Sequence, residues 1–457
     1  MLALAPAFAS AERASPPSFT NSRHDEDWRY LREPGNRTGA EWERYKFIPL
    51  DAVGQSFLTL GADVRLRYEG YRNNFWGDPP KPNEGYGWSR ILPYADLNIG
   101  PDFRLFGQMV GAWADRSRLT KGPVDETGPD LLQGFGQWRI RPNGGGSVLT
   151  AQGGRQLVAY GSERLIGLRF GPNVPLAFDG ALVRAEGGTW RIDGFFLRPV
   201  ENNLHGFDDR TDGSRRAYGV YATRELPEIG VGAGIDLYWI GYHRANARFN
   251  AGVGTEDRQT VGSRLFGALG NWAWNHEAML QFGRFGQDDI LAWSLATVTR
   301  YTFRDLPYLP FLELRANVIS GDGNAGDGTL GTFNALFPKG KYFGEIGLLG
   351  PYNLTNLHPV VGVDLGSGLS LSVAAVFYWR ESLADGIYGN PGNLLRPAGV
   401  SRARYIGTQA ELVLGWEATR NLSLEVSYAA FVPGRFIEET GPSRLVQFIG
   451  AEAQIRF

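Results

Sequence analysis

The chain has 457 residues, a formal net charge of -2 and 43% hydrophobic residues. It contains no run of about twenty apolar residues, which excludes a transmembrane helix, and its near-zero net charge argues against a nucleic-acid-binding surface. It also has 62 glycines, 13% aromatic residues and no cysteine, so disulfides, thiolate metal ligands and cysteine nucleophiles are excluded as well.

The first residues have the composition of the end of a secretory signal. Residues 1–9 are apolar and end in Ala7-Phe8-Ala9, the small-x-small pattern typical of a cleavage site. The basic stretch that normally precedes such a segment is missing, so we interpret residues 1–9 as a residual signal peptide whose true start lies upstream; a merely alanine-rich N-terminus is the alternative. Residues 10–56 begin polar and proline-rich, and we expect them to form a periplasmic lead-in.

From residue 57 onward, hydrophobic and polar residues alternate with a period of two in segments of about ten residues. In the first segment Leu60, Val64 and Leu66 take one face, while Asp63 and Arg65 take the other. A helix would not separate them in this way. The pattern predicts strands with one face in lipid and the other in a polar lumen.

Such segments recur to the end of the chain. They lie at residues 57–71, 88–100, 102–114, 130–141, 147–157, 176–186, 188–199, 216–225, 231–243, 259–269, 272–284, 290–303, 309–320, 357–366, 369–380, 404–417, 421–432 and 445–457. They predict an all-β fold, a transmembrane antiparallel up-and-down β-barrel of about 18 strands over residues 57–457. Sixteen strands is the alternative, because strand ends carry an error of about two to four residues.

The connections between these segments alternate in length. Tight turns such as Gly100-Pro101-Asp102, Gly270-Asn271 and Gly366-Ser367-Gly368 interleave with much longer loops. Short periplasmic turns and long external loops are typical of a Gram-negative outer-membrane barrel. One connection, between 272–284 and 290–303, is short where a long one is expected. We therefore predict localisation in the bacterial outer membrane, in contact with lipid and lipopolysaccharide.

Several motifs resemble the alginate export family of outer-membrane porins. They include Asp25-Glu26-Asp27-Trp28, Gly154-Arg155-Gln156, Phe178-Asp179-Gly180, Leu330-Gly331-Thr332-Phe333-Asn334 and Asn393-Leu394-Leu395-Arg396-Pro397. The resemblance implies a monomeric eighteen-stranded barrel and, in the members that export alginate, an arginine-lined lumen that draws a polyuronate. The motifs belong to the broad family and none marks the alginate exporter itself.

The alternation assigns a set of charged residues to the lumen. The predicted pore-lining residues are Arg65, Arg67, Arg155, Arg184, Arg191, Arg264, Arg315, Arg380, Arg456, Asp63, Glu69, Asp193 and Glu313, with Arg155 and Arg184 on less clearly alternating strands. Arginines around a narrow pore select anions, because water screens their field poorly there. The alternative is that they pair with lumenal carboxylates and give no selectivity. Pairing is favoured for any single arginine and selectivity for the group, with Arg65, Arg155 and Arg315 as the first candidates for the constriction.

The stretch from residue 320 to 357 is long for a structureless loop, and such loops tend to be functional. We expect it to fold inward and narrow the pore. The candidate constriction residues are Asp322, Asn324, Asp327, Phe333 and Asn334. The first three could form a calcium loop, but the bidentate glutamate of such a loop is missing, so a glycine-rich turn is the better interpretation. No metal or cofactor is predicted.

We predict a channel that passes an anionic solute, with a uronate polysaccharide such as alginate as one candidate. The alternative is a channel for another small or apolar solute without anion selectivity. An enzyme is not predicted, because a barrel hydrolase needs aligned Ser, His and Asn residues and only His276 lies inside a strand. We expect a monomer without nucleic-acid partners. The solute, the direction of transport, a loop plug and periplasmic export partners stay open.

Overall fold

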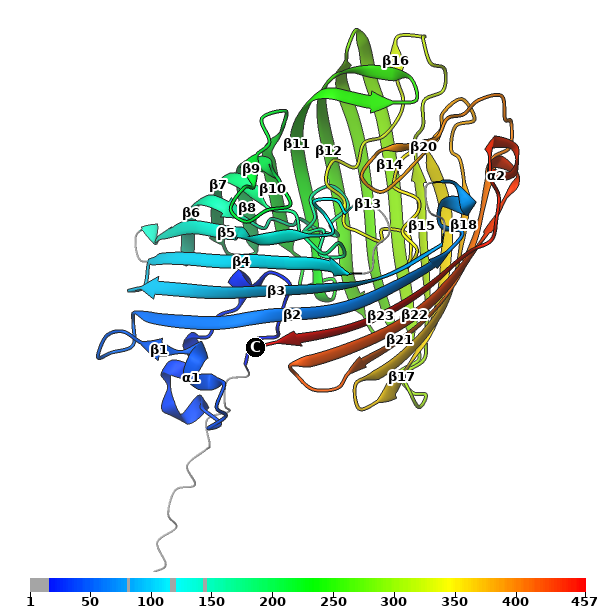
Figure 1. The fold of residues 1–457 in the computed structure, drawn as a ribbon. Coiled ribbons are helices and arrows are strands. Elements are labelled where there is room, and N and C mark those ends of the chain that lie inside the picture. Colours follow the sequence, from blue (N-terminus) through cyan, green and yellow to red (C-terminus); the bar gives the residue numbers. More distant parts are fainter. Residues whose placement is uncertain (1–15, 80–82, 116–120, 143–145) are drawn as a thin grey trace, which may run out of the picture.

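The chain forms a closed antiparallel β-barrel (Figure 1). The computed structural model describes residues 16–79, 83–115, 121–142 and 146–457, so the predicted signal remnant, residues 1–9, lies outside the described residues. The first barrel strand, β2 (Phe57–Arg72), pairs with the last, β23 (Val446–Arg456), and closes the ladder. The prediction of eighteen antiparallel strands is confirmed, and sixteen is excluded.

The strand bounds agree with the predicted segments to within a few residues in most places. Between β2 and β23 the barrel strands are β3 (Glu84–Ile99), β4 (Phe103–Asp115), β5 (Thr127–Ile140), β6 (Ser147–Gln156), β7 (Phe178–Gly187), β8 (Trp190–Glu201), β10 (Arg215–Glu225), β11 (Val231–Phe249), β12 (Gly252–Leu269), β13 (Trp272–Phe285), β14 (Asp288–Thr302), β15 (Phe311–Ile319), β17 (Leu354–Gly366), β18 (Leu369–Trp379), β21 (Tyr405–Glu417) and β22 (Leu422–Pro433). The largest difference is at the hairpin of β11 and β12, where the ladder continues to residues 249 and 252. The sequence pattern ends earlier because the exposed positions of this hairpin, such as Asn246 and Arg248, are polar, while Ala247 and Phe249 stay buried.

Several short elements lie outside the barrel wall. They are η1 (Arg23–Asp25), η2 (Arg29–Arg32), η3 (Pro34–Asn36), α1 (Glu43–Lys46), β1 (Ile48–Pro49), η4 (Asn74–Gly77), β9 (Arg210–Thr211), β16 (Thr329–Leu330), β19 (Ile387–Tyr388), β20 (Leu394–Arg396) and α2 (Arg435–Thr440). Within the described ranges, no helix has the length and apolar character needed to cross a membrane.

Alternation sorts the side chains of each strand between the lipid and the lumen. In β2, Leu66 and Tyr68 are exposed on the outside, while Asp63, Arg65 and Glu69 are buried inside. The inward carboxylates and arginines can satisfy one another, and the outward leucines meet the apolar bilayer. The predicted phase of this strand is therefore correct.

Loop lengths distinguish the two ends of the barrel. The connections at residues 157–177, 320–353 and 380–404 lie at one end, while β7 and β8 or β17 and β18 are joined by tight turns at the other. The external end also carries two tight hairpins, at residues 250–251 and 286–287. The second of these is the short connection that the sequence predicted.

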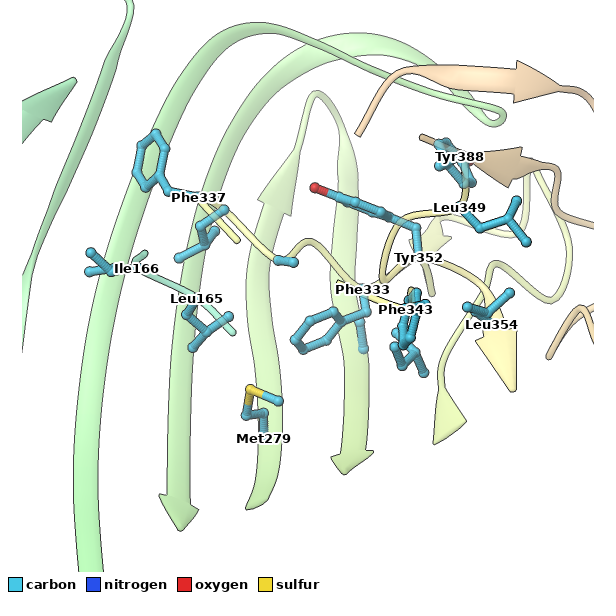
Figure 2. Packing of buried hydrophobic residues seen from close by; sticks show 14 of the residues in the cluster. Leu165, Ile166, Met279, Phe333, Phe337, Phe343, Leu349, Tyr352, Leu354 and Tyr388 are labelled. Carbon is cyan, nitrogen blue, oxygen red and sulfur yellow. The ribbon is translucent and has the colours of Figure 1, made fainter. Parts of the chain in front are cut away.

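Two of the long external connections fold into the lumen and meet there. We call residues 157–177 the first inward segment and residues 331–353 the second. Ile166 and Phe337 form a parallel bridge, supported by hydrogen bonds from the Phe337 N–H to the Leu165 carbonyl (2.8 Å) and from the Gly167 N–H to the Phe337 carbonyl (2.9 Å). Figure 2 shows Phe337 beside Leu165 and Ile166. The largest hydrophobic cluster of the described residues therefore lies inside the barrel.

The third long connection, residues 380–404, is held by a buried arginine. Arg380 is 0% exposed and donates to the backbone carbonyls of Leu383, Ser401 and Ala403, while its guanidinium lies 4.0 Å from the centre of the Phe436 ring. The prediction that Arg380 lines the pore is wrong. Its position follows the inward phase of β18, but the external loop covers it.

Replacing Arg380 with Gln should loosen the external connection without opening the barrel. Several carbonyl acceptors would lose a charged donor, at a cost of about 2 kcal/mol or more in the local stability of the loop. We expect faster proteolytic cleavage within residues 380–404 and an unchanged heat-induced shift of the barrel on gels. Arg402→Gln, at an exposed position of the same loop, is the control and should be cleaved like the wild type. Equal cleavage of both variants would contradict this role.

Candidate functional site

The inward segments divide the lumen into separate cavities. The outermost, which we call the outer vestibule, has a volume of about 420 Å³. Its polar side includes the cations Arg67, Arg169 and Lys341 and the carboxylates Glu69, Asp125 and Glu345, and its apolar and aromatic side includes Trp88 and Ile346. Arg67 pairs with Glu69 and Lys341 with Glu345, which leaves Arg169 as the cation of this lining without an ion pair among the described residues. Since it combines cations with apolar surface, it can accept a carboxylate carried on an apolar body.

The centre of the lumen carries cations where the two inward segments meet. Arg164 is buried and pairs with Glu277 of the β13 wall at 2.6 Å. Lys339 is bonded to the first segment through its backbone, from its N–H to the Glu163 carbonyl at 3.0 Å. Enclosure by protein, and then the charge of Arg164, lower the pKa of the Lys339 amine. Among the residues that the structure describes, no carboxylate lies within 4 Å of that amine.

Two further cavities lie toward the periplasmic end. The larger, about 1160 Å³, is lined by Arg191, Tyr221, Asp236 and Arg264 among others. The smaller, about 380 Å³, is lined by wall residues of β3 to β8 and by residues 22–29. We call it the periplasmic chamber. The two cavities share Arg191 in their linings.

Most of the predicted lumenal arginines face the lumen but are paired with carboxylates. The pairs are Arg67 with Glu69 (2.5 Å), Arg184 with Asp193 (2.8 Å), Arg264 with Asp236 (2.6 Å), Arg315 with Glu313 (2.6 Å) and Arg456 with Asp63 (3.3 Å). An arginine whose charge is balanced at this distance contributes little field to the pore. For each of these five arginines, the structure has the ion pair with a lumenal carboxylate that the sequence offered as the alternative to anion selectivity.

Arg65 anchors the first inward segment. It is buried and donates to the backbone carbonyls of Phe170 (2.8 Å) and Pro172 (2.8 Å) and to the Asn173 side chain (3.3 Å). Both of its terminal amino groups are therefore occupied by protein. Arg191, in contrast, faces the lumen and has no carboxylate within 4 Å among the described residues.

Arg155 lies on the outside of the barrel, so its prediction as a constriction residue is wrong. It stands opposite Gly134, on the face of the sheet that also carries Trp138, which is 56% exposed. There it forms a bidentate ion pair with Asp179 at 2.8 and 3.1 Å. The neighbouring glycines at 153 and 154 have no side chain, which hid the phase of this strand in the sequence.

The predicted constriction residues separate into two groups. Phe333 and Asn334 are buried against the wall, where the Asn334 amide donates to Glu256 at 2.9 Å. Asp322 is buried at the external end and accepts from the Gly331 N–H at 3.2 Å. Asn324 and Asp327 are exposed in the tip of the loop, so their prediction as constriction residues is wrong. The glycine-rich turn around them leads outward before the chain returns to the lumen.

Sequence reasoning missed Arg169 and Lys339. Both lie on loops, where no alternation gives a phase, and their positions depend on how the inward segments fold. The Arg169 guanidinium donates to the Pro338 carbonyl at 3.3 Å, and within the described part of the chain it forms no ion pair. Their flanking Gly171-Pro172 and Pro338-Lys339-Gly340 were the only local signal.

An acidic cluster lies where the connection after β8 packs on the start of β5. Ligand atoms of Asp130, Asp208 and Asp209 all lie within 4.8 Å of one another. Asp130 accepts hydrogen bonds from the backbone N–H groups of the other two (2.9 and 3.3 Å). None of the three residues lines any of the three cavities described above, and we assign the cluster no role in transport.

The comparisons with known proteins agree with this geometry. A family model described as alginate export matches residues 56–450. Among curated proteins, none matches the sequence. Solved structures with a similar fold include a BenF-like porin from Pseudomonas fluorescens Pf-5, with a TM-score of 0.59, 10% identity, and coverage of 87% of this chain and 98% of that one.

Two porins of Pseudomonas aeruginosa are similar to the same extent. OccK2 (OpdF), solved in complex with glucuronate, has a TM-score of 0.58 and 12% identity, covering 87% of this chain and 98% of its own. OpdK, solved with vanillate, has a TM-score of 0.57 and 11% identity, covering 87% and 99%. At these identities the likeness establishes the fold.

Residues 16–50, within the predicted lead-in of residues 10–56, pack on the periplasmic mouth through a buried lysine. The Lys46 amine is fully buried and donates to the Leu60 carbonyl (2.9 Å) and the Tyr94 hydroxyl (3.0 Å). Burial, and then Arg23, lower the pKa of this amine from 10.5 to about 7, against the opposing effect of Glu26. The docked lead-in therefore favours the neutral amine.

Docking of the lead-in should strengthen as the pH rises above about 7. Release takes up a proton between the two pKa values, so docking gains stability as the pH rises through that window. Below it the amine is charged in both states, and its contribution to docking no longer changes with pH. The ratio of cleavage rates within residues 16–50, wild type over Lys46→Met, should fall by up to about tenfold per pH unit between about pH 7 and about pH 9. The ratio cancels the protease's own pH dependence. A constant ratio would refute the assignment.

Proposed function

The chain belongs to the alginate export family and is an outer-membrane channel, and we propose that its solutes are small organic anions. The observation that carries this proposal is the distribution of unpaired cations. Arg169, Lys339 and Arg191 stand at the outer vestibule, the centre and the periplasmic cavities, while most other lumenal arginines have carboxylate partners. Unbalanced cations along a narrow path lower the energy of an anion at each step.

The size of the cavities favours small solutes over a polymer. Volumes of about 380, 420 and 1160 Å³ are comparable to small-molecule sites of about 300–1,000 Å³. A uronate polysaccharide such as alginate would also have to pass the junction of the inward segments, which backbone hydrogen bonds hold together. The vanillate and glucuronate with which the two porins were solved are both small carboxylates, which supports the same class here.

The outer vestibule favours a second candidate, a channel for small apolar solutes without anion selectivity. Val174, Leu176, Ile346 and Leu348 contribute to an apolar side of this cavity. We prefer the anion because these residues share the cavity with Arg169. In either case we expect the barrel to act as a monomer. For the anion channel, we expect Arg169 and Lys339 to carry the selectivity.

The double variant Arg169→Gln/Lys339→Gln should lose anion preference. In a planar bilayer under a KCl gradient, we expect an anion-selective reversal potential for the wild type and a chloride-to-potassium permeability ratio at least about twofold lower for the variant. The barrel wall is untouched, so conductance should persist.

Arg155→Gln is the matched control for this measurement. It removes one arginine from the outward face, and its reversal potential should equal that of the wild type. A wild-type channel without anion preference would refute the proposed solute class and favour the apolar alternative. An unchanged ratio in the double variant would remove Arg169 and Lys339 from the selectivity mechanism.

Removing the junction should widen the path. Replacing residues 333–338 with a glycine-serine linker deletes Phe337 and its bridge to Ile166, and single-channel conductance should rise by about twofold or more. The same exchange at residues 323–327, in the exposed tip, should leave conductance unchanged. If both linkers behave alike, the second inward segment does not obstruct the path.

A further inference from the structure

We propose that the lead-in and the lumen wall together form a second binding site, the periplasmic chamber, for a small hydroxylated carboxylate. The inference rests on the proposed function, because it takes the solute to be an organic anion, and it adds where such an anion is held before it leaves the channel. Residues 22–29 supply one wall and the lumenal faces of β3 to β8 supply the other.

The chamber lies on the path through the lumen. Its lining shares Ala159 and Arg191 with that of the larger periplasmic cavity. Its volume of about 380 Å³ is within the range of sites for single small molecules. A solute that has passed the centre of the lumen can therefore enter it.

The charges in the chamber leave cations in excess. Its carboxylates are held by arginines in three cases: Asp96 by Arg104 (2.7 Å), Asp27 by Arg29 (3.1 Å) and Glu26 by Arg23 (2.7 Å). Asp25 has only the His24 ring nearby, at 3.6 Å, and its side chain is 61% exposed. Burial lowers the pKa of that imidazole, so it contributes no charge near neutral pH.

Arg139 and Arg191 are the arginines of the chamber without a carboxylate within 4 Å, counting only residues that the structure describes. They come from β5 and β8, on opposite sides of the strands β6 and β7 that also line the chamber. Two unpaired guanidinium groups facing one enclosed space can bind a carboxylate with charge-assisted hydrogen bonds.

The remaining polar lining fits hydroxyl groups. Asn98, Gln137, Gln152 and Gln156 all contribute side-chain amides, and each amide offers both donors and an acceptor. Part of this capacity is used within the protein. The Gln152 amide donates to the Gln156 oxygen (2.6 Å), the Gln156 amide donates to the Gly180 carbonyl (3.3 Å), the Asn98 amide donates to Asp96 (3.3 Å), and the Gln137 oxygen accepts from Arg104 (3.5 Å). The Asn98 and Gln152 oxygens and the Gln137 amino group remain for a ligand. An aliphatic carboxylate would leave these amides without partners, which weakens its binding. The lining therefore selects a carboxylate that carries hydroxyl groups.

The wall formed by the lead-in is held in place by the barrel. Arg23 is buried and donates to the Phe457 carbonyl (3.1 Å), the Ala62 carbonyl (3.3 Å) and the Tyr94 hydroxyl (3.3 Å). The next residue, His24, packs edge-on against Phe106 and Phe135, with ring centres 5.8 and 5.5 Å apart. A wall that is fixed on both sides can define the shape of a site.

Calorimetric titration of the full-length protein in detergent tests the chamber. Gluconate and hexanoate have the same number of carbon atoms and the same charge, and differ in hydroxyl groups. We expect gluconate to bind at least about tenfold more tightly than hexanoate, and Arg139→Gln/Arg191→Gln to weaken gluconate binding by about tenfold or more. Arg141→Gln, at an exposed periplasmic turn where Arg141 pairs with Asp102, should bind as the wild type does.

A second variant tests the contribution of the lead-in. Arg23→Met removes the bonds that hold residues 22–29, and gluconate binding should weaken by at least about threefold. Wild-type affinity in this variant would remove the lead-in from the site. The heat-induced gel shift establishes that each barrel is folded; if the double variant is unfolded, Arg191→Gln alone should still weaken gluconate binding.

The two proposals fail in different measurements. Equal affinity for gluconate and hexanoate, or unchanged affinity in the folded double variant, would overturn the chamber while leaving the reversal potential of the channel as proposed. If the wild-type reversal potential shows no anion preference while gluconate still binds, the proposed transport function is overturned and the chamber remains as a binding site.

Discussion

The closed backbone ladder is the constraint on which the rest of this structure depends. In a bilayer each backbone N–H and C=O must find its partner within the protein, and pairing of β2 with β23 meets that demand at the seam. Closure leaves each side chain only two directions, toward lipid or toward the lumen. Most charged groups of the wall therefore point inside, where they act on one another and on any solute.

Collecting charges in this way limits how many remain available for a solute. An arginine and a carboxylate on neighbouring strands lie close enough to pair, as Arg184 does with Asp193 and Arg264 with Asp236, and such a pair offers little to a passing anion. Loops that fold into the lumen are not bound to the register of the strands. Arg169 and Lys339 come from these loops, and this origin explains why they lack the partners that strand neighbours provide.

The alternation in the sequence was sufficient for the barrel but only partly sufficient for the site. It predicts the inward phase of Asp63, Arg65 and Glu69 because one face must meet lipid. It fails at Arg155, where consecutive glycines carry no phase, and at Arg380, where phase is correct but an external loop covers the side chain. The alternation could not predict Arg169 and Lys339, because both lie on loops. The path of a loop depends on tertiary contacts such as that of Ile166 with Phe337. The periplasmic chamber needs both strand and loop geometry.

The contacts of Arg23 also bear on the order of assembly. Its carbonyl acceptors belong to Ala62, near the start of the barrel, and to Phe457, the last residue. These two acceptors come together only when the final strand has joined the first. The part of the chain that is synthesised earliest among the described residues thus acquires its docking site last, and a docked lead-in is the mark of a completed barrel.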